Sequence, residues 1–112
     1  MRIRELNDEY RACIGFPLGA HLANGQLVVT RGVALHGNDF IDRAVRAVRA
    51  YDDFAPENDP YGEHDLGSFE LDGQKLFWKL DYYSRDLEHG SPDPSDAAMT
   101  RRILTILLAE EY

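Results

Sequence analysis

The sequence predicts an α+β fold, in which a small antiparallel sheet of three or four strands carries helices on one face. Two segments repeat apolar residues at helical spacing, and the dipeptide Asp72-Gly73 joins two runs of alternating polarity, a strong short-range signal of a β-hairpin. A chain of 112 residues with 44% hydrophobic content can bury one core but not two. We therefore expect a single domain over residues 1–112.

The first expected helix occupies the N-terminal segment. Its apolar positions, spaced mostly three or four apart, are Ile3, Leu6, Tyr10, Cys13 and Ile14. Gly15 and then Pro17 end this pattern. Because Cys13 lies on the apolar side, we expect it to pack in the core. As the only cysteine, it also excludes a disulfide within the chain and a zinc site built from thiolates.

A strand is expected over Gln26 to Thr30. The turn signal Asn24-Gly25 precedes it, and the run from Leu27 to Thr30 is rich in β-branched residues. Whether Gly19 to Ala23 forms a hairpin partner for this strand is left open, as is the conformation of Gly15 to Asn24 as a whole.

A second helix is expected to begin at Gly37 or Asn38. Either residue can cap it, and Asp39 places a favourable negative charge in the first turn. Its apolar stripe consists of Ile41, Ala44, Val45 and Val48. Another flank carries the largest basic patch of the chain, made of Arg43, Arg46 and Arg49. We interpret this flank as a solvated helix face whose arginines reach toward neighbouring acids.

The hairpin is the clearest local prediction. Its strands are expected at Leu66 to Leu71 and Gln74 to Tyr83, on either side of Asp72-Gly73. Side chains alternate between the two faces of a sheet, so the register of a two-residue turn decides which of them are buried. This register pairs Phe69 with Leu76 on the apolar face and Glu70 with Lys75 on the wet face.

The wet face of the hairpin raises the possibility of self-association. It carries Phe77 and Tyr83 among charged residues. Two such faces, or two exposed strand edges, can meet across a two-fold axis. A homodimer is therefore left open, since the charges on the same face oppose such pairing.

A last helix is expected from Asp93-Pro94 onward. Asp93 can cap it, Pro94 suits the first helical position, and Asp96 completes an acidic first turn. Its apolar positions are Met99, Ile103, Leu104, Ile106, Leu107 and Leu108. We expect this helix to be the most buried one and to lie across the apolar face of the hairpin.

The overall charge narrows the classes of function. Twenty acids against twelve bases give a net charge of −8. A direct nucleic-acid ligand is not expected, because Lys and Arg supply most of the affinity for phosphate backbones. A basic protein surface is the expected partner. No apolar run approaches the roughly 20 residues of a membrane span, and the N-terminus turns polar too early for a signal peptide, so we expect a cytoplasmic protein without membrane contact.

The most unusual stretch places six carboxylates within fourteen residues. They are Asp52, Asp53, Glu57, Asp59, Glu63 and Asp65. The wider run from Tyr51 to Gln74 contains no Lys or Arg. We interpret these six carboxylates as the candidate partner-binding residues, although a connector built from turn-forming residues explains the same composition.

The alternative for this stretch is a small metal-dependent hydrolase. Carboxylates and imidazole suit a divalent transition metal, and a further carboxylate can act as general base. The candidate ligands are Asp59, Glu63, His64 and Asp65. Their spacing matches no established metal or nucleophile motif. A non-catalytic binding protein, with no cofactor and no catalytic residue, is therefore the leading hypothesis.

Four segments of the chain resemble a known bacterial family. They are Asn58 to Asp65, Phe77 to Tyr83, Gly90 to Pro94 and Arg102 to Tyr112. Through them the chain is similar to the uncharacterised proteins called domain of unknown function 3768, which are often carried on plasmids and other mobile elements. That family has no established activity. The resemblance implies a mobile-element accessory, and we expect an anti-CRISPR or anti-restriction inhibitor that presents carboxylates to a basic nucleic-acid-binding site of a host defence complex.

Overall fold

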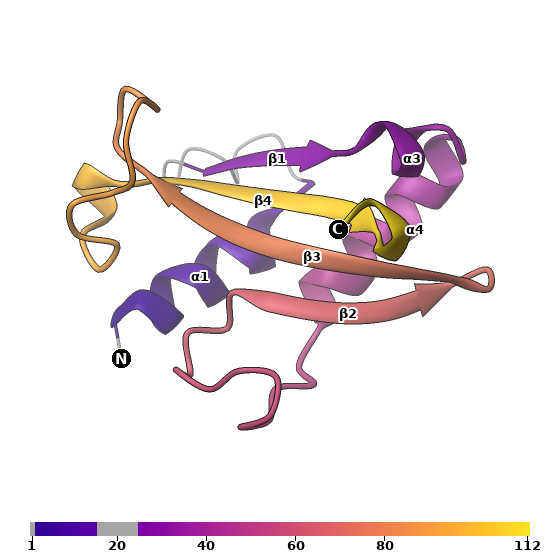
Figure 1. The fold of residues 1–112 in the computed structure, drawn as a ribbon, viewed down its shortest axis with the longest axis horizontal. Helices are drawn as coiled ribbons and strands as arrows, with labels where there is room; N and C mark the ends of the chain where they lie inside the picture. The colour runs from indigo at the N-terminus through magenta and orange to yellow at the C-terminus, as the bar shows by residue number, and fades with distance from the viewer. Residues whose placement is uncertain (1, 16–24) are drawn as a thin grey trace.

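The computed structural model describes residues 2–15 and 25–112. The elements follow in the order α1 (Arg2–Cys13), β1 (Gly25–Val29), α3 (Arg31–Ala34), α4 (Asn38–Ala50), β2 (Leu66–Leu71), β3 (Gln74–Tyr83), the 3-10 turn η1 (Ala97–Met99), β4 (Arg101–Leu108) and the 3-10 turn η2 (Ala109–Glu111). The strands form one four-stranded sheet, and α1 and α4 lie together behind it in Figure 1. The α+β fold predicted from the sequence is confirmed.

The sheet is mixed rather than purely antiparallel. Its strand order is β1-β4-β3-β2. β3 pairs antiparallel with both β2 and β4, whereas β1 runs parallel to β4, from Gly25 opposite Arg102 to Val29 opposite Ile106. Parallel strands need a long crossover connection. The chain supplies it here, because α3, α4 and the whole hairpin lie between β1 and β4.

The hairpin forms as predicted. Phe69 lies opposite Leu76, which places both on the side of the core. Asp72 and Gly73 have φ angles of 52° and 77°, and a type I′ turn requires positive φ at both of these positions. The chemistry of a two-residue turn therefore fixes which face every side chain of β2 and β3 occupies.

The predicted last helix is wrong. The segment after Asp93-Pro94 forms only the short turn η1, and Arg101–Leu108 is the strand β4 in the middle of the sheet. Leu104 and Ile106 face the core, while Ile103 lies on the opposite side. A short run that is apolar at almost every position fits a buried strand and a buried helix equally well by periodicity.

The core fills the space between the sheet and the two long helices. Tyr10 of α1 and Val48 of α4 belong to one buried cluster with Trp78 and Leu104 of the sheet. A Cβ atom at Gly67 would collide with the indole of Trp78, so the absence of a side chain there lets the ring lie against β2. The helices predicted at α1 and α4 are confirmed, whereas the four-residue helix α3 was not expected.

Two further expectations concern the N-terminal third. Cys13 is half-buried beside the core rather than fully enclosed. The suggested hairpin partner at Gly19 to Ala23 lies outside the residues that the structure describes. Within the described parts of the chain, no helix combines the length and apolarity that a membrane span requires.

Candidate functional site

The segment between α4 and β2, residues 51–65, is an ordered loop that we call the acidic loop. Asn58 stabilises its first half, because its side-chain oxygen accepts from the Ala55 N–H at 2.8 Å and its amide donates to the Asp53 carbonyl at 3.0 Å. The Tyr51 hydroxyl donates to the same carbonyl at 3.2 Å. The turn-forming residues of the sequence therefore fix the loop through its own hydrogen bonds.

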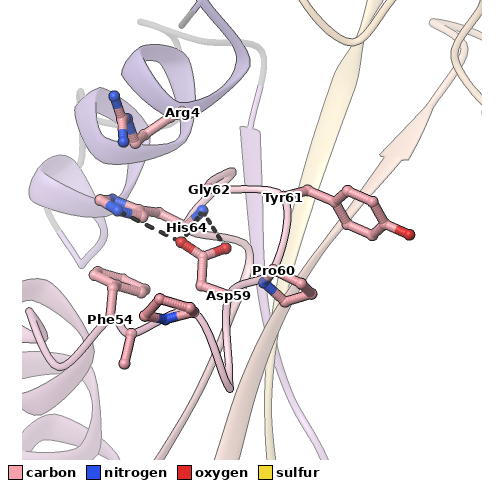
Figure 2. Close-up of a pocket in the computed structure, with 9 residues that line it drawn as sticks. Arg4, Phe54, Asp59, Pro60, Tyr61, Gly62 and His64 are labelled. Atoms are coloured by element: carbon pink, nitrogen blue, oxygen red, sulfur yellow. Dashed lines mark hydrogen bonds and ion pairs between the residues drawn. The ribbon is translucent and has the colours of Figure 1, made fainter.

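His64 lies at the centre of the second half (Figure 2). Its φ of 54° is in the left-handed region, which is unfavourable for most residues with a Cβ atom. Its backbone N–H donates to the Asp59 carboxylate at 3.2 Å, and its ring Nε2 lies 3.6 Å from Asp59 Oδ2. Nδ1 lies 3.0 Å from Asp8 Oδ1 of α1, and the Phe54 ring stacks on the imidazole at 3.8 Å. Both ring nitrogens therefore face carboxylates of the protein.

An open pocket of about 460 Å³ lies beside His64. It is lined by Arg4, Phe54, Ala55, Pro56, Asp59, Pro60, Tyr61, Gly62 and His64. In Figure 2, Arg4 approaches from α1 and Tyr61 points away from the pocket. The pocket lining thus combines an aromatic ring with a guanidinium, a carboxylate and an imidazole, groups that can bind a polar ligand.

Helix α1 holds the start of the acidic loop. Arg11 donates to the carbonyls of Val48 and Tyr51, where α4 ends and the loop begins. Its guanidinium also lies 5.3 Å from the centre of the Phe54 ring and 3.3 Å from Asp8 Oδ1. Although the sequence pattern places Arg11 on the polar side of α1, the structure buries it beneath the loop.

Helix α1 also holds the end of the loop, through Asn7. Its amide donates to the Glu63 carbonyl at 2.9 Å and to the Tyr82 hydroxyl at 2.8 Å. Arg102 of β4 donates to the Asn7 side-chain oxygen at 2.7 Å, and both side chains are fully buried. Sequence reasoning missed the role of Asn7, and its position four residues after Ile3 and three before Tyr10, on the apolar side of the helix, is the available signal.

The structure divides the six predicted partner-binding carboxylates into two groups. Asp52, Asp53 and Glu57 are exposed, and none of them forms an ion pair within residues 2–15 and 25–112. The other three turn toward the protein: Asp59 is buried against His64, and Glu63 and Asp65 are half-buried. Only the first group is fully available to a partner in solution.

Unneutralised negative charge acts on the inner group. Burial raises the pKa of Glu63, and the neighbouring Asp65 and Asp59 raise it further. Burial also raises the pKa of Asp65, with smaller contributions in the same direction from Asp59 and Asp81. Both shifts mean that the loop favours protonated, uncharged carboxyls more than water does.

On the arginine flank of α4, Arg43 and Arg46 reach neighbouring acids as predicted. Arg43 pairs with Asp39 at 2.9 Å and makes two hydrogen bonds, of 2.8 and 2.7 Å, to Asp72 of the hairpin turn. Arg46 pairs with the acid four residues before it, at 2.6 Å. Arg49 donates to a backbone carbonyl at the end of α1. The acids near α4 are thus neutralised locally, unlike those of the acidic loop.

The four residues of the metal alternative do not form a ligand group. Asp59 and His64 contact each other, and the second ring nitrogen of His64 faces Asp8. Across the described residues, no three His, Cys, Asp or Glu side chains gather as a metal site requires. The geometry therefore gives that alternative no support.

Comparison with known proteins gives one match. A family model for proteins of unknown function, DUF3768, matches residues 29–111, about three quarters of the chain. No curated protein and no solved structure matches it. The matched range contains the whole acidic loop and the hairpin, whereas α1, which anchors the loop, precedes it. Because the match spans most of the chain, the protein belongs to the DUF3768 family of proteins of unknown function.

Proposed function

We propose that the protein is a non-catalytic binding protein that docks on a basic protein surface through the outer edge of the acidic loop. One observation carries this proposal. Asp52, Asp53 and Glu57 are exposed without an ion-pair partner among the described residues, whereas acids such as Asp39 and Asp72 are held by an arginine. The available negative charge is therefore concentrated where a partner can reach it.

The loop presents these acids from a fixed framework. The Asp53 carbonyl receives hydrogen bonds from Tyr51 and Asn58, and Asp59 and His64 hold the second half in place. A partner that binds a preorganised loop loses little conformational entropy in ordering it. Tyr61, 80% exposed on the same loop, adds an aromatic side chain of the kind that is enriched at protein interfaces.

The basic partner in this proposal is a nucleic-acid-targeting defence complex of a bacterial host. Such complexes hold DNA or RNA in channels rich in Lys and Arg. Exposed carboxylates on an ordered loop have the same sign of charge as a phosphate backbone and can occupy such a channel. The protein then acts in the cytoplasm as a mobile-element accessory of the anti-CRISPR or anti-restriction type.

The test measures DNA cleavage by purified CRISPR effector complexes and restriction endonucleases in the presence of the protein. We expect inhibition that weakens as the salt concentration rises. Reversal of Asp52, Asp53 and Glu57 to Lys is expected to abolish it. A matched control variant has the same change in net charge at three exposed acids outside the loop, namely Glu9, Glu88 and Glu110.

Two outcomes contradict parts of this proposal. Equal loss of inhibition in the loop variant and in the control means that net charge, and not the acidic loop, carries the effect. If no complex is inhibited, the defence function is wrong. The docking surface is then tested on its own with immobilised polyarginine, to which the loop variant must bind more weakly than the control.

A further inference from the structure

The sheet has a second face that α1 and α4 do not cover. Side chains alternate along each strand, so Leu76 and Trp78 of β3 face the helices while Phe77 and Lys79 face the opposite side. We call this opposite side the open face, and Figure 1 shows both long helices behind the sheet. It carries partly exposed apolar residues from all four strands, including Val28, Leu66, Phe77 and Ile103.

The open face carries both signs of charge in similar numbers, with Lys75, Lys79 and Arg101 against Glu70 and Asp81, unlike the chain as a whole. Both lysines of the protein lie there, Lys75 opposite Glu70 and Lys79 within 3.2 Å of Asp81. A patch of one sign repels its own image, so a surface that meets a second copy of itself cannot carry a large excess of one sign. The open face meets this condition, and the outer edge of the acidic loop does not.

The open face also has a projection and a hollow side by side. Tyr112 is 72% exposed and packs against Phe77, with the ring centroids 5.1 Å apart. A hollow of about 70 Å³ lies on the other side of Phe77 and is lined by Asn58, Leu66, Gly67 and Ser68. A two-fold axis near Phe77 brings the projection of each copy toward the hollow of the other.

We propose that the open face binds a second copy of this chain, face to face about a two-fold axis, and so forms a homodimer. Its apolar residues make the centre of the contact, as in protein interfaces generally. Because the contact is symmetric, every interaction across it occurs twice.

Sedimentation equilibrium of the full chain over the micromolar range tests the proposal. The wild type is expected to have twice the 12.7 kDa mass of one chain. Phe77→Glu is expected to be a monomer, because each interface would otherwise bury two unpaired carboxylates. The matched control is Leu35→Glu, the same kind of change at a 75% exposed apolar residue outside the sheet, and it should remain a dimer.

A charge exchange makes the test independent of whether Phe77→Glu folds. Lys79→Glu leaves the open face acidic, so it is expected to dissociate the dimer. The double variant Lys79→Glu/Asp81→Lys restores both signs and is expected to restore the dimer. Thermal melting of each variant verifies that a monomeric mass does not come from an unfolded chain.

Three results overturn the proposal. The first is a wild type that stays monomeric at its highest soluble concentration. The second is a dimer that persists in either Phe77→Glu or Lys79→Glu. The third comes from a fluorescent single-stranded oligonucleotide, since aromatic and basic side chains on an open sheet also suit base stacking. Binding by a monomeric wild type, lost in Phe77→Glu, makes the open face a nucleic-acid platform instead.

Discussion

Helix α4 and the acidic loop that follows it differ in whether their carboxylates are neutralised by nearby cations. On α4, Asp39 and Asp42 each lie four residues before an arginine, and the pairs Asp39–Arg43 and Asp42–Arg46 are 2.9 and 2.6 Å apart. Helical geometry brings residues at this spacing together. The loop has neither helical spacing nor a cation of its own, because the run from Tyr51 to Gln74 contains no Lys or Arg.

The difference shows that the spacing between acids and arginines along the chain, as well as their numbers, decides which carboxylates remain unneutralised. The acids of α4 are engaged by their own helix and contribute to the fold. The exposed acids of the loop are held in place by its backbone and by contacts with α1, yet they are not neutralised among the described residues. Of these two regions, it is the loop that presents exposed, uncompensated negative charge.

Removing the support of the loop should have the largest effect. In Asp59→Ala, the His64 backbone N–H loses its acceptor while its unfavourable φ remains, so we expect a loss of stability of about 1–3 kcal/mol. Urea unfolding measures the loss, and hydrogen exchange at the His64 amide shows whether the loop opens locally. Asp59→Asn keeps an acceptor oxygen and should lose less. Unchanged stability in Asp59→Ala would show that Asp59 does not hold the loop.

Removing a cation from α4 should have a smaller effect that depends on salt. Arg43 bonds to Asp39 and Asp72, but all three side chains are well exposed, and water and ions screen such pairs. We expect Arg43→Gln to melt at a slightly lower temperature than the wild type in low salt and at the same temperature in high salt. A difference that is independent of salt would mean that Arg43 acts through packing.

The same variant has a signature in acid. The hydrogen bonds from Arg43 lower the pKa of Asp72. A carboxyl with a lowered pKa in the folded state stabilises the fold above its ordinary value of 3.8, and this contribution is lost as the pH falls through the lowered value. Arg43→Gln should therefore lose stability less steeply than the wild type below pH 4. Parallel curves of stability against pH would contradict the assignment.

The elements that the sequence predicts correctly depend on neighbouring residues. The Asp72-Gly73 turn specifies the hairpin by itself, and Gly37 and Asp39 mark the start of α4 within one turn. β4 depends on distant residues instead, because Arg102 and Ile106 become strand residues by pairing with β1 and β3. Its short apolar run contains no local feature that separates a central strand from a buried helix.

The candidate site was predictable only for its exposed half. A run of acids without Lys or Arg correctly indicates a charged surface at Asp52, Asp53 and Glu57. The burial of Asp59 was not predictable, because it depends on a cluster in which His64 meets Asp8, a residue 56 positions away. Periodicity places Asp8 on a polar helix face and gives no indication of which loop covers that face.

The last prediction concerns the inner carboxyl Glu63 and has the smallest expected effect. Burial and the charges of Asp65 and Asp59 raise its pKa in the folded state above the ordinary value of 4.5. A raised pKa favours the fold below the ordinary value, and this contribution is lost as the pH rises through the raised value. At neutral pH the charged form therefore weakens the fold, and Glu63→Gln, which keeps size and shape, should be more stable than the wild type.

The pH dependence of this gain distinguishes its cause. The advantage of Glu63→Gln should be present at pH 7 and vanish below about pH 4, where the wild-type carboxyl is protonated in both the folded and the unfolded chain. Glu57→Gln, in the exposed half of the same loop, removes the same charge from the molecule and serves as the control. Equal gains in both variants would mean that net charge alone is responsible. A larger gain at Glu63 would show that the two halves of the loop differ. Charge on the inner half then lowers the stability of the fold, whereas charge on the exposed outer half does not.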